Sequence, residues 1–184
     1  ESYSTAFSTH LDLASFYTGK EKFESAKAHF IKCYEMMLKF KQPTVLELCL
    51  YENTASFYSR QGDEDQAEVY VKASLAIYEE LYSQYPSQGQ NYVWLGNVSL
   101  KKGNFIEARS YLTKATELSE RVKLPNKLLT KIRRAKFSYN LDTSNFSEAY
   151  EACSEFSDLV NAGLKDYCKA RLNIQMKNYG EAKE

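Results

Sequence analysis

Histidine and cysteine are the side chains in this sequence best suited to metal binding, and their spacing does not favour it. His10 and His29 are the only histidines, and neither has a second histidine four residues away, the spacing that places two imidazoles on one side of a helix. The four cysteines contain no Cys-x-x-Cys pair and lie at Cys33, Cys49, Cys153 and Cys168. Because a free cysteine packs like a small apolar residue, we expect buried, reduced thiols and no metal site.

Nucleophilic and phosphate chemistry also lack a local signature. A catalytic nucleophile needs a base within hydrogen-bond reach, and that base needs an orienting partner, but no stretch brings such residues together at a recognised spacing. The glycines form no G-x-G-x-x-G or Walker-type run that could hold a phosphate group. We therefore expect a protein that is not an enzyme and that binds no cofactor.

Small residues recur instead at a fixed interval, which indicates a structural repeat. Alanine recurs in a first series, and a second series of residues lies twelve positions before it. Two helices can cross closely only where neither carries bulk, so each such pair predicts two helices packed against each other. Fixed self-similarity is typical of a solenoid. The first series is Ala26, Ala67, Ala108 and Ala149, which are 41 residues apart, and then Ala182 after 33 more; the second is Ala14, Ala55, Gly96, Phe137 and Ala170.

Apolar periodicity together with proline and glycine predicts helices separated by short turns. Pro86, Ser87 and Gly89 indicate a longer connection. In the fourth copy Phe137 stands where a small residue is expected, so we expect its first helix to shift by two residues, which would place Ala135 at the crossing and lengthen the loop at 142–145. The helices are predicted at about residues 2–18, 22–41, 43–60, 64–83, 88–102, 105–123, 126–141, 146–161, 164–177 and from 180 onward.

These residues resemble the tetratricopeptide repeat family. Leu95-Gly96, Gly103-Asn104-Phe105, Ala108, Leu112 and Ala115 follow the family pattern, and Tyr92 stands at its opening aromatic position. The resemblance implies an all-α fold, a right-handed superhelical solenoid of antiparallel helix pairs, and the interval of 41 residues resembles that of the long-helix variants. We expect residues 1–184 to form a single array that is part of a longer protein, with repeats at 7–41, 46–83, 88–123 and 126–161 and an incomplete repeat at 164–184.

The resemblance also implies that the first helix of each pair lines a concave groove that holds a segment of a partner protein. Family members that capture the acidic C-terminus of heat-shock chaperones use a carboxylate clamp of Lys, Asn and Arg on successive first helices. The matching row here reads Leu11, Glu52, Val93 and Arg134, so we expect no partner of the clamp type. A neighbouring row contains Gln90 and Lys131. The candidate groove residues are Ser15, Glu52, Ser56, Val93, Asn97, Lys131, Arg134 and Ser138.

The distribution of charge restricts the classes of partner further. Lysine plus arginine (24) balance aspartate plus glutamate (24), which gives no general attraction to nucleic acid or to an anionic membrane. Residues 121–136 nevertheless hold seven basic residues and no acid, whereas residues 137–164 hold five acids and no base. This pattern has three interpretations: the two stretches compensate each other in solvent, the basic stretch binds nucleic acid, or the basic stretch recognises an acidic partner segment. The net charge of zero disfavours nucleic acid.

The sequence thus predicts a non-catalytic scaffold that holds a protein or peptide segment within a larger complex. The segment is expected to be acidic where Lys131 and Arg134 line the groove. The alternative is a peptide-sensing regulatory domain that controls an attached effector module. Because the cysteines are expected to be reduced and the first residues lack the pattern of a secretory signal, we expect a cytoplasmic or nuclear protein that binds neither nucleic acid nor membrane.

Overall fold

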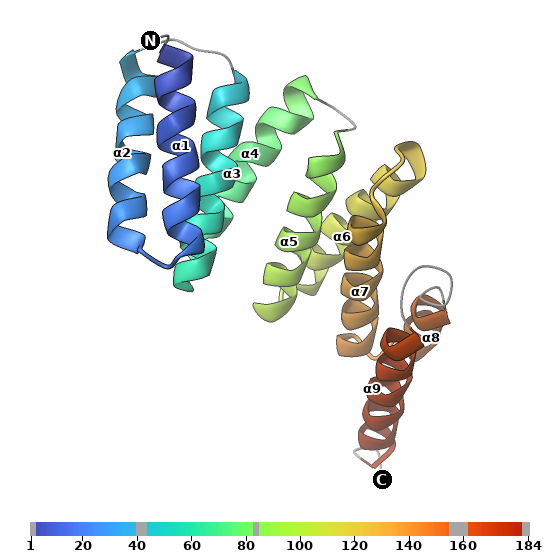
Figure 1. Ribbon diagram of the computed structural model, residues 1–184. Coiled ribbons are helices and arrows are strands. Elements are labelled where there is room, and N and C mark those ends of the chain that lie inside the picture. The colour runs from blue at the N-terminus through green and yellow to red at the C-terminus, as the bar shows by residue number, and fades with distance from the viewer. Residues whose placement is uncertain (1–2, 40–43, 83–84, 155–161, 182–184) are drawn as a thin grey trace. The chain divides into compact units, whose positions relative to one another are not determined.

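A computed structural model of the protein describes residues 3–39, 44–82, 85–154 and 162–181 (Figure 1). Within these ranges every regular element is an α-helix, which confirms the predicted all-α class. The protein divides into two compact units, residues 1–83 and 84–184. Unit 1 contains α1 (Tyr3–Gly19), α2 (Phe23–Lys39), α3 (Thr44–Gln61) and α4 (Glu64–Leu81). Unit 2 contains α5 (Pro86–Lys101), α6 (Phe105–Arg121), α7 (Asn126–Asp142), α8 (Phe146–Ser154) and α9 (Ala162–Glu181).

Consecutive helices pack as pairs inside each unit. In unit 1, α1 packs against α2 and α3 against α4; in unit 2, α5 packs against α6 and α7 against α8 (Figure 1). From α1 to α7, each helix begins and ends within two residues of its predicted bounds. Helix α4 shows why the starts are well defined: the Asp63 carboxylate accepts a hydrogen bond of 3.0 Å from the Gln66 backbone N–H and so caps the helix.

The turn inside each pair has one backbone conformation that recurs every 41 residues. The amide N–H that follows the left-handed residue donates to a carbonyl five residues earlier, at 2.8 to 3.0 Å. This bond is that of a Schellman motif, which satisfies a carbonyl that the end of the helix would otherwise leave open. The repeated turn therefore fixes where each second helix starts. The left-handed residues are Glu21 (φ 57°), Gly62 (φ 82°), Gly103 (φ 75°) and Ser144 (φ 57°).

The recurring alanines lie buried in each pair, as the sequence predicts. Ala26, Ala67, Ala108 and Ala149 are each 0% exposed. In the third pair, a Cβ atom placed on Gly96 would lie 2.8 Å from Leu112 Cδ2 and 3.6 Å from the Ala108 carbonyl oxygen. A larger residue at this crossing would therefore force the Leu112 side chain to move, so Gly96 favours the close approach of α5 and α6.

The shift predicted for the fourth pair is wrong. The turn at Ser144 keeps the 41-residue register, and the loop after α7 is no longer than the loop after α5. Phe137 stays at the position equivalent to Gly96, and it is buried in one cluster with Cys153, which is equivalent to Leu112. A large residue on the first helix is thus offset by a small one on the second. Ala135 is buried as well, but it does not replace Phe137.

The connection predicted at residues 86–89 is also wrong, because α5 already begins at Pro86 and contains Ser87 and Gly89. Proline suits the first helical position, where its missing N–H costs no hydrogen bond. A Cβ atom on Gly89 would lie 3.2 Å from Leu128 Cδ2 of α7. This glycine therefore allows α5 to pack closely against α7 and does not mark a loop.

The last predicted pair is not seen in the described residues. A break was predicted between residues 177 and 180, but α9 continues to Glu181. Ala170, the predicted crossing residue, is exposed, whereas Cys168 and Leu172 pack into the cluster of α7 and α8. Glycine costs a helix only about 1 kcal/mol, so Gly180 alone does not end α9. The predicted end of α8 at 161 and the crossing at Ala182 lie outside the described residues.

Candidate functional site

A row of polar side chains follows one face of α7. Lys127, Lys131, Arg134 and Ser138 are separated by four, three and four residues, the spacing of a single helix face. At a rise of about 1.5 Å per residue, the row extends over about 16 Å. The three cationic side chains are exposed or partly exposed, and Ser138 is partly buried. Lys131, Arg134 and Ser138 are residues that the sequence singles out, and Lys127 extends their row toward the start of the helix.

Helix α5 packs beside α7 and contributes Gln90 and Asn97, two residues on one of its own faces. A pocket of about 240 Å³ opens near the start of both helices, and Gln90, Lys127 and Lys131 help to line it. Gln90 and Lys131 hold equivalent positions in successive repeats, so this pocket brings two members of a predicted row together. We call the face formed by Gln90, Asn97, Lys127, Lys131, Arg134 and Ser138 the α5–α7 surface.

The α5–α7 surface is positive because few acids belong to its helices. Helix α5 contains no acidic residue, and α7 contains only Asp142, its last residue. Burial raises the pKa of the Asp142 carboxyl group, and the Arg171 guanidinium group opposes that rise. Within the described ranges, neither Lys131 nor Arg134 makes an ion pair. Their charges therefore remain available to an acidic ligand.

Val93 and Trp94 differ in how much surface they offer beside this row. Val93, a predicted groove residue, is only 5% exposed, so it offers a partner little to contact. Trp94 lies four residues after Gln90 and three before Asn97, on the same helix face, and it is partly exposed. Trp94 is also the single tryptophan of the sequence, so its fluorescence reports on the α5–α7 surface.

Three further groove candidates belong to unit 1. Ser15 on α1 is exposed, and so is Ser56 on α3. Glu52 on α3 is partly buried, and its carboxylate accepts a hydrogen bond of 2.7 Å from the Tyr78 hydroxyl group on α4. Burial raises the pKa of Glu52, and this hydrogen bond acts in the opposite direction. Glu52 therefore connects the two helices of its pair.

Sequence reasoning missed a pair of histidines. The Nδ1 atoms of His10 on α1 and His29 on α2 are 2.9 Å apart, so one imidazole N–H donates to the other ring. The signal was present in the sequence, because the two residues stand at similar distances from the turn at Glu21. Among the described residues, no three His, Cys, Asp or Glu side chains gather where they could hold a metal ion.

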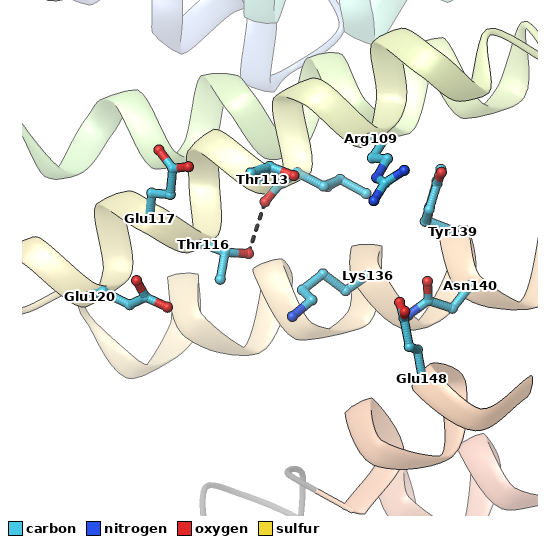
Figure 2. A pocket seen from close by; sticks show the side chains of 10 residues that line it. Arg109, Thr113, Thr116, Glu117, Glu120, Lys136, Tyr139, Asn140 and Glu148 are labelled. Carbon is cyan, nitrogen blue, oxygen red and sulfur yellow. Dashed lines mark hydrogen bonds between the residues drawn. The ribbon is translucent and has the colours of Figure 1, made fainter. Parts of the chain in front are cut away.

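A second pocket was also missed. It has a volume of about 320 Å³ and lies between α6, α7 and α8, where Arg109, Lys136, Asn140 and Glu148 are among the residues that surround it (Figure 2). The sequence carries no distinctive signal for it: Asn140 stands at the position of Tyr17 and Tyr58, but Ser99 of the third repeat already lacks that aromatic residue.

Paired helices joined by one repeated turn define a helical-repeat protein. The model of the tetratricopeptide repeat family matches residues 46–121, which contain α3–α4 and α5–α6. The same turn recurs outside the match, in α1–α2 and α7–α8, and together with the match it supports an assignment to the tetratricopeptide repeat family. No curated protein matches the sequence. Repeats of this family generally serve as non-catalytic modules that bind proteins or peptides.

In the ranges that the structure describes, none of the helices is long and apolar enough to cross a membrane.

Proposed function

We propose that the protein is a non-catalytic scaffold that holds an acidic segment of a partner protein on the α5–α7 surface. The observation that carries this proposal is the row of Lys127, Lys131 and Arg134, whose charges no acidic residue of α5 or α7 opposes until Asp142. The pocket beside Lys127 and Lys131 provides room for a side chain of the partner. The match to the tetratricopeptide repeat family model supports the general role.

The spacing of the cations indicates the form of the ligand. Lys127 and Lys131 are separated by about 6 Å along the helix axis, and Arg134 lies about 4.5 Å further. In an extended peptide, side chains on the same face recur every second residue, about 6.6 Å apart. A segment with acidic residues at alternating positions therefore fits the row, with charge-assisted hydrogen bonds to each cation. Gln90 and Asn97 can pair with the backbone of the peptide through their amide groups.

The test uses a fluorescein-labelled peptide of the sequence Gly-Glu-Ser-Glu-Ser-Glu-Gly and the full protein, followed by fluorescence anisotropy. The matched control peptide carries Gln in place of each Glu. Exposed charge pairs contribute about 0.2–1 kcal/mol each, so three of them predict roughly three-fold to more than 100-fold tighter binding of the Glu peptide, falling with added salt.

Reversal of charge gives the decisive comparison. The double variant Lys131→Glu and Arg134→Glu is expected to weaken binding of the Glu peptide about tenfold or more, because two attractions become repulsions. The control double variant Lys27→Glu and Lys39→Glu makes the same change in net charge at exposed positions of α2. Equal affinities for the Glu and Gln peptides, or equal losses in both double variants, would overturn the proposal.

A further inference from the structure

The pocket of about 240 Å³ on the α5–α7 surface has basic and neutral lining residues. Lys127 and Lys131 of α7 contribute two ammonium groups, and Ser87 and Gln90 of α5 contribute a hydroxyl group and an amide. Leu128 and two prolines complete the lining, and among the residues that the structure describes no carboxylate belongs to it. Within the same residues, neither lysine makes an ion pair. The pocket therefore favours an anion.

The chain around the pocket does not cancel this charge. Residues 81–106 contain no acid, and neither do residues 121–141, so both helices that form the pocket are acid-free beside it. Helix α6 packs against both of them and does contain acids. Glu117 and Glu120 of α6, however, line the pocket between α6, α7 and α8. The two pockets of unit 2 thus differ in charge, and only the one on the α5–α7 surface is purely basic in its lining.

Close packing of α5 and α7 holds the walls of this pocket. Leu128 is buried, and a Cβ atom placed on Gly89 would lie 3.2 Å from its Cδ2 atom. Pro86 is the first residue of α5 and Pro125 directly precedes α7, and both line the pocket with backbone φ angles that their rings restrict. The walls are therefore formed before a ligand binds, which lowers the cost of ordering them.

Phosphate and carboxylate groups match this lining to different degrees. A phosphorylated serine carries about −1.5 to −2 charges at pH 7 and three acceptor oxygens, whereas a carboxylate carries one charge on two oxygens. Lys127 and Lys131 are about 6 Å apart along the axis of α7, and their flexible stems let both ammonium groups reach one anion between them. A phosphate group can therefore neutralise both lysines and still accept a hydrogen bond from Ser87 or Gln90.

We propose that this pocket binds the phosphate group of a phosphorylated serine in the partner segment, so that phosphorylation of the partner regulates its capture. This inference rests on the proposed function and names the residue that enters the pocket. Lys127 and Lys131 bind the phosphate through charge-assisted contacts, and Ser87 and Gln90 donate hydrogen bonds to its other oxygens. Arg134, which does not line the pocket, binds a carboxylate of the same segment.

The test compares three fluorescein-labelled peptides on the full protein by fluorescence anisotropy. Their sequence is Gly-Glu-Ser-X-Ser-Glu-Gly, where X is phosphoserine, glutamate or serine. A glutamate flanks X on each side, so the comparison does not depend on the direction in which the peptide binds. Relative to the X = Glu peptide, the phosphopeptide gains one charge contact and one hydrogen bond, which predicts roughly three- to 60-fold tighter binding.

Matched variants of α7 locate the source of this preference. Lys127→Gln and Arg134→Gln each remove one positive charge from the same helix face. Lys127→Gln should lower the preference for the phosphopeptide over the X = Glu peptide at least twofold. Arg134→Gln should weaken both peptides by a similar factor and leave the preference unchanged. Lys127→Arg keeps the charge and should retain the preference.

The preference should also depend on pH. The second ionisation of a phosphate group has a pKa of about 6, whereas glutamate and lysine keep their charges between pH 7.5 and 5.5. The phosphopeptide therefore loses its second charge as the pH falls, and its preference over the X = Glu peptide should decline about two- to fourfold. The ratio of the two affinities cancels any effect of pH on the fold, because both peptides meet the same protein.

Failure of this inference and failure of the proposed function give different results. Equal binding of the phosphopeptide and the X = Glu peptide, or an unchanged preference in Lys127→Gln, would overturn the phosphate site alone. The proposed function fails if Gly-Glu-Ser-Glu-Ser-Glu-Gly binds no more tightly than its Gln counterpart.

Nucleic acid is the other source of phosphate, and a competition experiment distinguishes it. A single-stranded thymidine decamer should displace the phosphopeptide only weakly, because each of its phosphodiesters carries one charge. A decamer that binds more tightly than the phosphopeptide, and that loses this affinity in Lys127→Gln, would assign the pocket to nucleic acid and overturn the proposal.

Discussion

The crossing of α5 and α6 offers a sharp test of how the repeat is held together. Replacement of Gly96 by alanine should destabilise unit 2, although alanine favours a helix over glycine by about 1 kcal/mol. The new Cβ atom would lie 2.8 Å from Leu112 Cδ2 and 3.0 Å from Leu112 Cγ. Leu112 is buried, so it cannot turn away into solvent. Overpacking of this kind costs about 1–3 kcal/mol, which leaves a net loss of about 1 kcal/mol.

The measurement is urea or thermal unfolding of Gly96→Ala alone and in a Leu112→Val background. A net loss of about 1 kcal/mol lowers the melting temperature by about 4–8 °C for a unit of this size. In the Leu112→Val background the shorter residue leaves room for the methyl group, so Gly96→Ala should become neutral or stabilising. A Gly96→Ala variant that is more stable than the native protein by the full helix propensity would refute the reasoning about the crossing.

Three further outcomes follow from contacts inside the pairs. His10→Ala and His29→Ala should show a coupling of about 1 kcal/mol in a double-mutant cycle of urea unfolding, because each change breaks the 2.9 Å bond between the rings; additive losses would contradict that bond. Ser144→Gly should stabilise the protein by about 0.5–1 kcal/mol in thermal melts, because φ is 57° there, whereas Gly103→Ala should destabilise it. Burial raises the pKa of the Cys33 thiol to about 11 from 9.0. Its thiolate fraction at pH 8 is therefore about 100-fold below that of a free thiol. Its reaction with a disulfide reagent should be correspondingly slow until urea unfolds the protein. Because the unfolded thiol ionises first, the stability that depends on neutral Cys33 is present below pH 9 and declines as the pH rises toward 11.

The helix pairs could be predicted because their determinants are local and repeated. Four alanines at one interval mark the crossings, and the turn residues share that interval, so each copy supports the assignment of the others. Two helices and their short connections fill each interval of 41 residues, which leaves little freedom in where each helix ends. This is why α1 to α7 lie within two residues of their predicted bounds.

Features that depend on a partner residue could not be predicted in the same way. Phe137 fits its crossing only because Cys153 is small, and the sequence pattern treats the two positions separately. Gly89 resembles a loop residue until Leu128 of α7 is placed against it. The second pocket is lined by residues of α6, α7 and α8, so it can be recognised only once three helices are packed together.

The candidate site was predictable in its charges but not in its geometry. Lys131 and Arg134 stand out in a basic stretch, and their spacing places them on one face of α7. The burial of Val93 and the contact of Glu52 with Tyr78 depend on neighbouring helices. A comparison of equivalent positions in the repeats gives no information about those helices. Repeat register therefore identifies which residues are equivalent, and packing decides which of them are accessible.

The most direct test of the α5–α7 surface is to map where an acidic peptide binds. The isotope-labelled protein is titrated with Gly-Glu-Ser-Glu-Ser-Glu-Gly, and the shift of each backbone amide and of the Trp94 indole N–H is recorded. We expect saturable shifts concentrated at Gln90, Trp94, Lys127, Lys131 and Arg134, with much smaller shifts on α2 and α4. Shifts that are spread evenly over exposed lysines, or that are absent from α5 and α7, would contradict the assignment of this surface as the site that holds a partner.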